Sequence, residues 1–208
     1  VLAGRDVDAV LARRPDALAY AVNQDFRPAE SEEEMLRCLR AGINVVTSGH
    51  YGLLHPASAP AELRDRFEAA CQEGGATILS SGIDPGFAND TLPLTLTGVA
   101  EHWSQVRVQE IVNYATYDQG DTVMNVMGFG QPLDAKPYLL EPGVLSLAWG
   151  GTIRSLARGL GLELDEIREV HERRPAEREI DLSYGHIAEG TSAALRFEVQ
   201  GIVDGEVA

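Results

Sequence analysis

An alternation of apolar strands and amphipathic helices near the start of this chain limits its fold more than any other feature. Short apolar runs at 17–22, 43–47 and 76–80 have the length and composition of buried strands. The segments between them, which begin near Ser31 and Ser58, repeat apolar residues at helical spacing. Strands joined by helices of this length pair in parallel, because each crossover returns the chain to the same end of the sheet. The pattern predicts an α/β domain with a doubly wound parallel sheet that helices cover on both faces.

Capping residues mark the expected ends of these helices. Ser31 and Glu34, three residues apart, have the form of a capping box, and Gly42 provides a stop for the same helix. Gly74 and Gly75 provide the stop for the next one. These residues predict one helix from Ser31 to just before Gly42 and a second that ends at Gly74.

The pattern changes after about Leu92. Residues 105–117 are rich in β-formers, 144–162 carry the apolar stripe of a helix, and 193–203 alternate apolar and polar side chains as a half-buried strand does. Strands and helices no longer alternate regularly in this part of the chain. It is therefore expected to be an α+β region.

The two patterns predict two domains. Residues 1–92 are expected to form part of a ligand-binding α/β domain, and 93–208 an α+β domain for substrate binding and self-association. The sequence opens at Val1 on a helix-like segment and stops shortly after Asp204-Gly205, a pair that commonly turns a hairpin. We therefore expect a fragment that lacks an opening strand and a closing strand.

Charge and composition exclude several classes of partner. With 32 acidic and 17 basic residues the formal charge is −15, which disfavours nucleic acids and anionic membranes. No apolar run approaches the roughly 20 residues of a membrane span. Cys38 and Cys71 are isolated, as in cytoplasmic proteins, and His171 and His186 have no metal-ligand partners at useful spacing. We expect a cytoplasmic protein with no metal.

The loops that follow the three predicted strands are the expected ligand site, because ligands of doubly wound sheets bind beyond the carboxyl ends of the strands. Gly49 lets the main chain approach a ligand closely, and the Pro85-Gly86 pair forces a tight reversal. Ordinary turn and capping roles remain the alternative for each residue. The expected ligand contacts are Asn23, Thr47, Ser48, Gly49, Asp84, Pro85, Gly86 and Phe87.

Two further groups of residues have side chains suited to catalysis or substrate binding. His50 and Tyr51 follow the second strand, and an imidazole with a pKa of roughly 6.5 can donate a proton near neutral pH. Tyr114, Tyr117 and Trp149 could line a largely apolar substrate pocket with hydroxyl and indole groups, although core packing explains aromatic residues equally well.

Five stretches of the chain resemble the dihydrodipicolinate reductase-like proteins, which include 2,4-diaminopentanoate dehydrogenase and the native NAD(P)-dependent amine dehydrogenases. The most distinctive element is the G-I-[ND]-P-G-F-x-x-D-x-L-P string, and the likeness extends over nearly the whole chain. The five stretches are AGINVVTSG, AACQEGGATI, SSGIDPGFANDTLPLTLTG, VQEIVNYATYD and MGFGQP.

This resemblance implies a Rossmann-like domain whose glycine loop lies upstream of Val1, followed by a dimerising substrate domain. It implies NAD- or NADP-dependent hydride transfer to or from a C=N, CH–NH2 or C=O carbon of a small molecule. It also implies that Asn23, residues 47–49 and residues 84–87 frame the nicotinamide, and that Tyr114 and Tyr117 face the substrate.

The chain departs from the family pattern in two places. Amine dehydrogenases of this kind tend to carry a glutamate in the loop that here reads SGHYGLLHP, and Asp84 replaces the more usual asparagine. No G-x-G-x-x-G motif occurs. The missing glutamate favours an alternative, a non-catalytic nucleotide-binding or assembly protein. A sugar or polyol dehydrogenase is a further alternative, which would require a lysine after one of these strands, and none is there.

Overall fold

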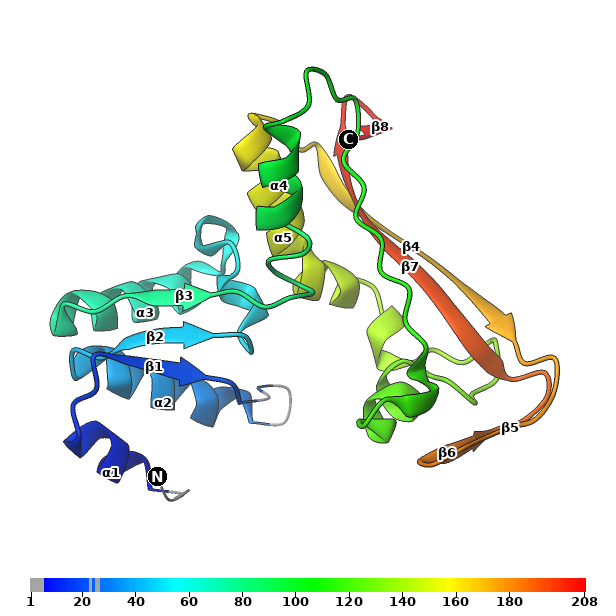
Figure 1. Cartoon of the computed structure of the whole chain (residues 1–208), viewed down its shortest axis with the longest axis horizontal. Helices are drawn as coiled ribbons and strands as arrows, with labels where there is room; N and C mark the ends of the chain where they lie inside the picture. Colours follow the sequence, from blue (N-terminus) through cyan, green and yellow to red (C-terminus); the bar gives the residue numbers. More distant parts are fainter. Residues whose placement is uncertain (1–5, 23, 25–26) are drawn as a thin grey trace. The chain divides into compact units, whose positions relative to one another are not determined.

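The computed structural model describes residues 6–22, 24 and 27–208 of the chain. It consists of two compact units, Val1–Leu92 and Pro93–Ala208, drawn in Figure 1. No helix in the described part of the chain is both long enough and apolar enough to span a membrane.

A three-stranded parallel sheet forms the first unit, as the sequence predicts. The strands lie in the order β1 (Ala17–Tyr20), β2 (Asn44–Thr47) and β3 (Ile78–Ser80). Helices α2 (Pro28–Arg40) and α3 (Ala61–Gly74) connect them and run alongside the sheet (Figure 1). The chain therefore makes two successive crossovers in one direction across the sheet.

Short elements complete this unit. Helix α1 (Val7–Ala12) precedes β1, and two 3-10 turns, Tyr51–Leu53 and Pro56–Ser58, follow β2. Helix α4 (Thr91–Thr97) contains the boundary between the units. The long loop that connects β2 to α3 thus contains two short helical turns.

Only one face of the sheet is covered within the described residues. Leu36, Leu39 and Val45 are fully buried in the core between the sheet and its helices. On the opposite face Val46 and Leu79 are exposed. The expectation of helices on both faces is therefore not met in this part of the chain, because α2 and α3 pack against the same face.

Helix α2 starts earlier than its expected capping box. It begins at Pro28, and the proline is well suited to the first helical position because its missing N–H has no acceptor there. Ser31 lies inside the helix and is buried. The Glu34 carboxylate does not cap the helix but accepts hydrogen bonds from the Tyr20 hydroxyl and the Arg27 guanidinium, both at 2.5 Å.

The second unit combines one long helix with antiparallel strands. Two long strands of this unit pair through most of their length, and the helix packs against them. The predicted helix over 144–162 and strand over 193–203 are confirmed by α5 and β7. The elements are α5 (Val144–Leu160), β4 (Glu166–Pro175), β5 (Ile180–Leu182), β6 (Gly185–Ile187), β7 (Ser192–Val203) and β8 (Glu206–Val207).

Short helical turns precede α5. They are a 3-10 turn at Tyr114–Thr116, a π-helical turn at Thr122–Val126 and a 3-10 turn at Tyr138–Leu140. Val123 and Leu145 are the most deeply buried members of the core that these turns share with α5 and the strands.

The prediction of a β-rich segment over 105–117 is wrong for this structure. The segment contains the 3-10 turn Tyr114–Thr116 and no strand. Ile111 and Val112 are exposed, so these two β-formers are not buried as they would be in a core strand. A high content of β-forming residues shows that a segment can form a strand, but a strand also needs a backbone neighbour to pair with.

The start of α5 is held by a carboxylate from the neighbouring strand. Glu169 on β4 accepts hydrogen bonds from the backbone N–H groups of Gly143, at 3.0 Å, and Ser146, at 2.6 Å. Burial acts to raise the pKa of Glu169, but the hydrogen bonds outweigh it and the pKa is lowered. The charge also lies at the positive end of the helix dipole.

Glu169→Gln is therefore expected to lower the free energy of unfolding by about 1 kcal/mol at pH 7. Because the pKa is depressed in the folded state, this contribution is present above the unfolded pKa and is lost as the pH falls through the folded pKa. Urea unfolding at pH 7 and pH 3 should show the difference from wild type shrinking at pH 3. Glu166→Gln, which affects an exposed pair with Arg168, is the matched control. An equal loss in both variants would contradict the capping role.

Candidate functional site

The three parallel strands end level with one another. Tyr20 is in register with Thr47, and Thr47 with Ser80, so the last residues of β1, β2 and β3 form one row. The Ser81 N–H donates to the Thr47 carbonyl at 2.9 Å, which continues the pairing one residue past β3. The loops that follow the strands therefore leave from one edge of the sheet, where the sequence predicts ligand contacts.

The loop after β2 passes close to the end of β1. A Cβ atom on Gly49 would lie 2.5 Å from the Val22 carbonyl oxygen, so only glycine fits this approach. Thr47 is buried, and its hydroxyl accepts a hydrogen bond from the Gly49 N–H. Ser48 is exposed at the same edge. Asn23, the predicted contact after β1, lies outside the described residues.

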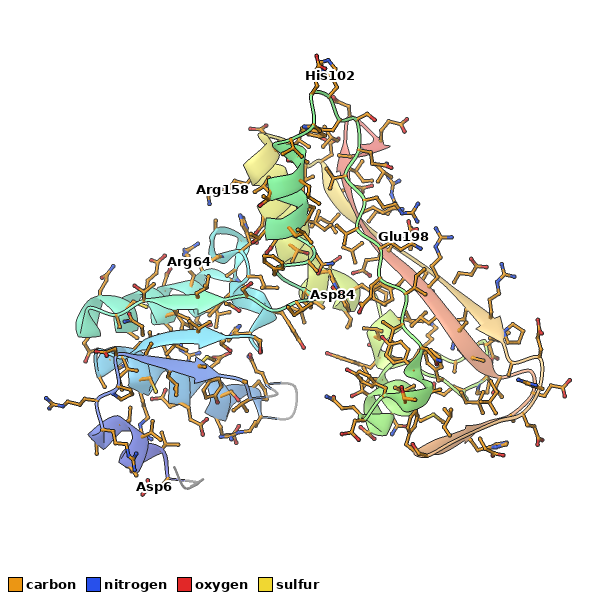
Figure 2. The ribbon with its side chains drawn as sticks, viewed as in Figure 1. Asp6, Arg64, Asp84, His102, Arg158 and Glu198 are labelled. Carbon is orange, nitrogen blue, oxygen red and sulfur yellow. The ribbon has the colours of Figure 1, made fainter. Side chains whose placement is uncertain are left out.

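The Asp84-Pro85-Gly86-Phe87 corner folds back on the end of β3. Gly86 has φ of +139°, and a Cβ there would lie 2.3 Å from the Gly82 nitrogen. The Phe87 N–H donates to the Gly82 carbonyl at 2.8 Å, and the Asp84–Pro85 peptide bond is cis. Figure 2 labels Asp84 at this turn. The corner is thus a tight reversal made largely of backbone.

Two apolar side chains are exposed here, one just before the corner and one in it. Ile83 is 72% exposed and Phe87 is 47% exposed. A Cβ on Gly82 would lie 3.8 Å from the Ser48 carbonyl oxygen, so the corner adjoins the loop after β2. Exposed apolar side chains beside close-packed backbone could contact a flat ring with a polar substituent.

The two predicted proton donors, His50 and Tyr51, differ in burial. His50 is only 3% exposed, and its ring meets the Phe67 ring edge-on at a centroid distance of 5.5 Å. Tyr51, at the start of the following 3-10 turn, retains exposed surface. Burial lowers the pKa of His50, while Glu32, whose Oε1 lies 3.5 Å from Nε2, acts to raise it. The position of Glu32 beside His50 was not anticipated from the sequence.

The predicted substrate contacts of the second unit lie in an aromatic environment. The rings of Tyr114 and Tyr117 meet edge-on at 5.2 Å, and Tyr114 also contacts Phe129. Trp149 instead stacks at a tilt on Phe197, with centroids 4.8 Å apart. The structure thus brings the two tyrosines together and places the tryptophan on α5 against β7.

A separate hollow of about 310 Å³ lies between α3 and β3 in the first unit. Its lining is mainly apolar and includes Leu53, Phe67, Cys71 and Ile78. None of the predicted ligand contacts that the structure describes borders it. In the described part of the chain, no group of three histidine, cysteine or acidic side chains could hold a metal ion.

Comparisons with known proteins place the chain beside amine dehydrogenases. No family model matches it. It is 46% identical over 202 residues to an amine dehydrogenase of Streptomyces virginiae, covering 97% of this chain and 56% of that protein. It is 23% identical over 212 residues to the 2,4-diaminopentanoate dehydrogenase of Acetoanaerobium sticklandii, covering 100% of this chain and 58% of that protein.

A solved structure has a similar fold. The amine dehydrogenase from Mycobacterium smegmatis matches with a TM-score of 0.68 at 20% identity, over 94% of this chain and 57% of that one. This match supports the order of a helix-covered parallel sheet followed by an antiparallel region. The chain spans a little over half the length of the relatives it matches. The resemblance drawn from the sequence is confirmed.

Proposed function

From its homology with amine dehydrogenases, we propose that the chain forms the nicotinamide end and the substrate region of an NAD(P)-dependent oxidoreductase. The reaction is hydride transfer to or from a C=N or CH–NH2 carbon, or a C=O carbon, of a small organic molecule. The identity of 46% over nearly the whole chain is the observation that carries this proposal. The chain spans only part of that relative, so the activity is proposed for the protein that contains these residues.

The described residues fit the nicotinamide end of the cofactor. Ile83 and Phe87 offer exposed apolar surface at the corner, and Ser48 and Gly49 offer a hydroxyl and closely approaching backbone at the same edge. The sequence contains no G-x-G-x-x-G loop for the pyrophosphate. The proposed contribution of this chain is therefore to the reactive end.

The bound cofactor would supply the hydride. The loops at the sheet edge would hold the nicotinamide and the reacting carbon close together and exclude water. His50 or Tyr51 would donate a proton to the substrate nitrogen or oxygen as the hydride arrives. Of the two, Tyr51 has the more accessible side chain.

The second unit is proposed to bind the substrate and to mediate dimer formation. Tyr114 and Tyr117 together provide aromatic surface with two hydroxyl groups. Leu147 on α5 and Val170 on β4 leave apolar surface exposed. Light scattering of the purified protein would test the dimer, and a monomer at micromolar concentration would contradict it.

Cofactor oxidation tests the proposed activity. The longest expressible protein that contains residues 1–208 is assayed with NADH and NADPH against a panel of ketones, with and without ammonia. Amines and hydroxy compounds are tested in the reverse direction. We expect turnover that requires ammonia. Ammonia-independent reduction would indicate a hydroxyl dehydrogenase, and stoichiometric cofactor binding without turnover would favour the non-catalytic alternative.

A further inference from the structure

A buried imidazole lies directly behind the sheet edge. His50 is three residues past the end of β2, and its ring is enclosed by Phe67 of α3, Gly52 and Glu32 of α2. The Ser80 hydroxyl donates to the His50 carbonyl at 2.7 Å, which ties this backbone to β3. The residue therefore links the loop after β2 to both helices of the unit and to β3.

The ring nitrogens of His50 lack ordinary partners. Within the described residues, both Nδ1 and Nε2 are buried without a hydrogen bond. A buried polar group of this kind is costly unless something compensates for its lost hydration. The Glu32 Oε1 atom, 3.5 Å from Nε2, is at ion-pair distance and can compensate when the ring is protonated.

Glu32 is itself held by a cation. Its Oε2 atom lies 2.9 Å from an Arg66 guanidinium nitrogen, while Oε1 faces His50. Side-chain exposure rises along this row, from 4% for His50 to 17% for Glu32 and 44% for Arg66. The carboxylate thus connects the buried ring to the surface of α3.

We propose that Glu32 is a positioning residue that holds the His50 imidazole, and through it the loop of residues 48–55, beneath the carboxyl edge of the sheet. This inference rests on the proposed function, in which that loop borders the nicotinamide. Glu32 acts through His50 and need not touch the reacting atoms. Arg66 orients the carboxylate by pairing with Oε2, which leaves Oε1 facing His50.

The charges around His50 determine the sign of the expected effects. Burial lowers the pKa of His50 and Glu32 acts to raise it, while the positive charge of Arg66 lies on the far side of the carboxylate. Phe67 and Ser80 contribute no charge. Removing the Glu32 charge should therefore favour the neutral ring, and removing Arg66 should favour the protonated ring.

NMR titration of the His50 ring tests the coupling in this chain without cofactor. The resonance is assigned by its loss in His50→Asn. In Glu32→Gln we expect the protonation constant of His50 to fall at least about tenfold. In Arg66→Met it should rise. Glu33→Gln removes a neighbouring exposed charge that pairs with Arg40, and it should leave the constant unchanged. The same titration midpoint in wild type, Glu32→Gln and Arg66→Met would overturn the inference.

Thermal unfolding provides a second test. Because the folded pKa of His50 is depressed, stability is lost as the pH falls below about 6.5 and through the folded pKa. The loss of melting temperature in Glu32→Gln should be larger at pH 5.5 than at pH 8. An equal loss at both pH values would indicate only a structural bridge to Arg66 and would contradict the inference. Neither readout depends on turnover, so a failure of the proposed oxidoreductase activity would be seen separately.

Discussion

Replacing His50 and Tyr51 together with phenylalanine is expected to lower turnover about 10²- to 10⁴-fold, the usual contribution of a general acid. The affinity for NAD(P)H should change little, because phenyl rings keep the packing of the loop after β2. The His50 ring already meets Phe67 edge-on, so a phenyl ring can occupy the same place. Steady-state kinetics and a fluorescence titration with the reduced cofactor measure the two quantities.

The single variants assign the donor. His50 is buried while Tyr51 has exposed surface, so Tyr51→Phe should account for most of the loss if the donor contacts the substrate directly. His50→Phe should then have only a small effect, because a phenyl ring keeps the packing against Phe67. Turnover that is unchanged in the double variant would reject both residues as proton donors.

Gly86→Ala is expected to destabilise the first unit by about 3 kcal/mol and to weaken cofactor binding. Its φ of +139° is unfavourable for alanine, and the added Cβ would lie 2.3 Å from the Gly82 nitrogen. The corner must therefore open, which would move Phe87 away from the sheet edge. Urea unfolding and cofactor titration measure the two effects.

Gly75→Ala is the matched control for this change. Gly75 also has a positive φ, of +64°, but a Cβ there meets nothing within 4 Å. Its replacement should cost only about 1 kcal/mol and leave cofactor binding intact. An equal loss of stability in both variants, with unchanged cofactor affinity, would contradict a role for the close approach of Gly86 to Gly82.

The parallel sheet could be predicted because its determinants are local. Each strand is a short apolar run, each helix has an apolar stripe, and crossovers of this length permit only parallel pairing. The 144–162 helix and the 193–203 strand were predictable for the same reason. The start of α2 was misplaced because Pro28 suits the first turn better than Ser31 suits the cap, and Glu34 bonds elsewhere.

Features that depend on distant neighbours could not be predicted. Residues 105–117 are rich in β-formers, but in the described chain they form no strand, and Gln105 and Arg107 reach β8 and β7 through their side chains. The contact of Glu32 with His50 arises because α2 begins at the edge where β2 ends, and no local pattern encodes that distance. A carboxylate one turn into the helix after a strand, with a histidine in the next strand-end loop, is the signal that could have suggested it.

Backbone amide NMR of the 15N-labelled chain, titrated with reduced nicotinamide mononucleotide at millimolar concentration, would show whether the sheet edge binds the reactive end of the cofactor. This ligand needs no pyrophosphate loop, so it isolates the residues that the chain contributes. Saturable shifts that are largest at Ser48, Gly49, Gly86 and Phe87 are expected. Saturable shifts elsewhere, or no shifts at these four amides, would contradict a nicotinamide site at the ends of β2 and β3.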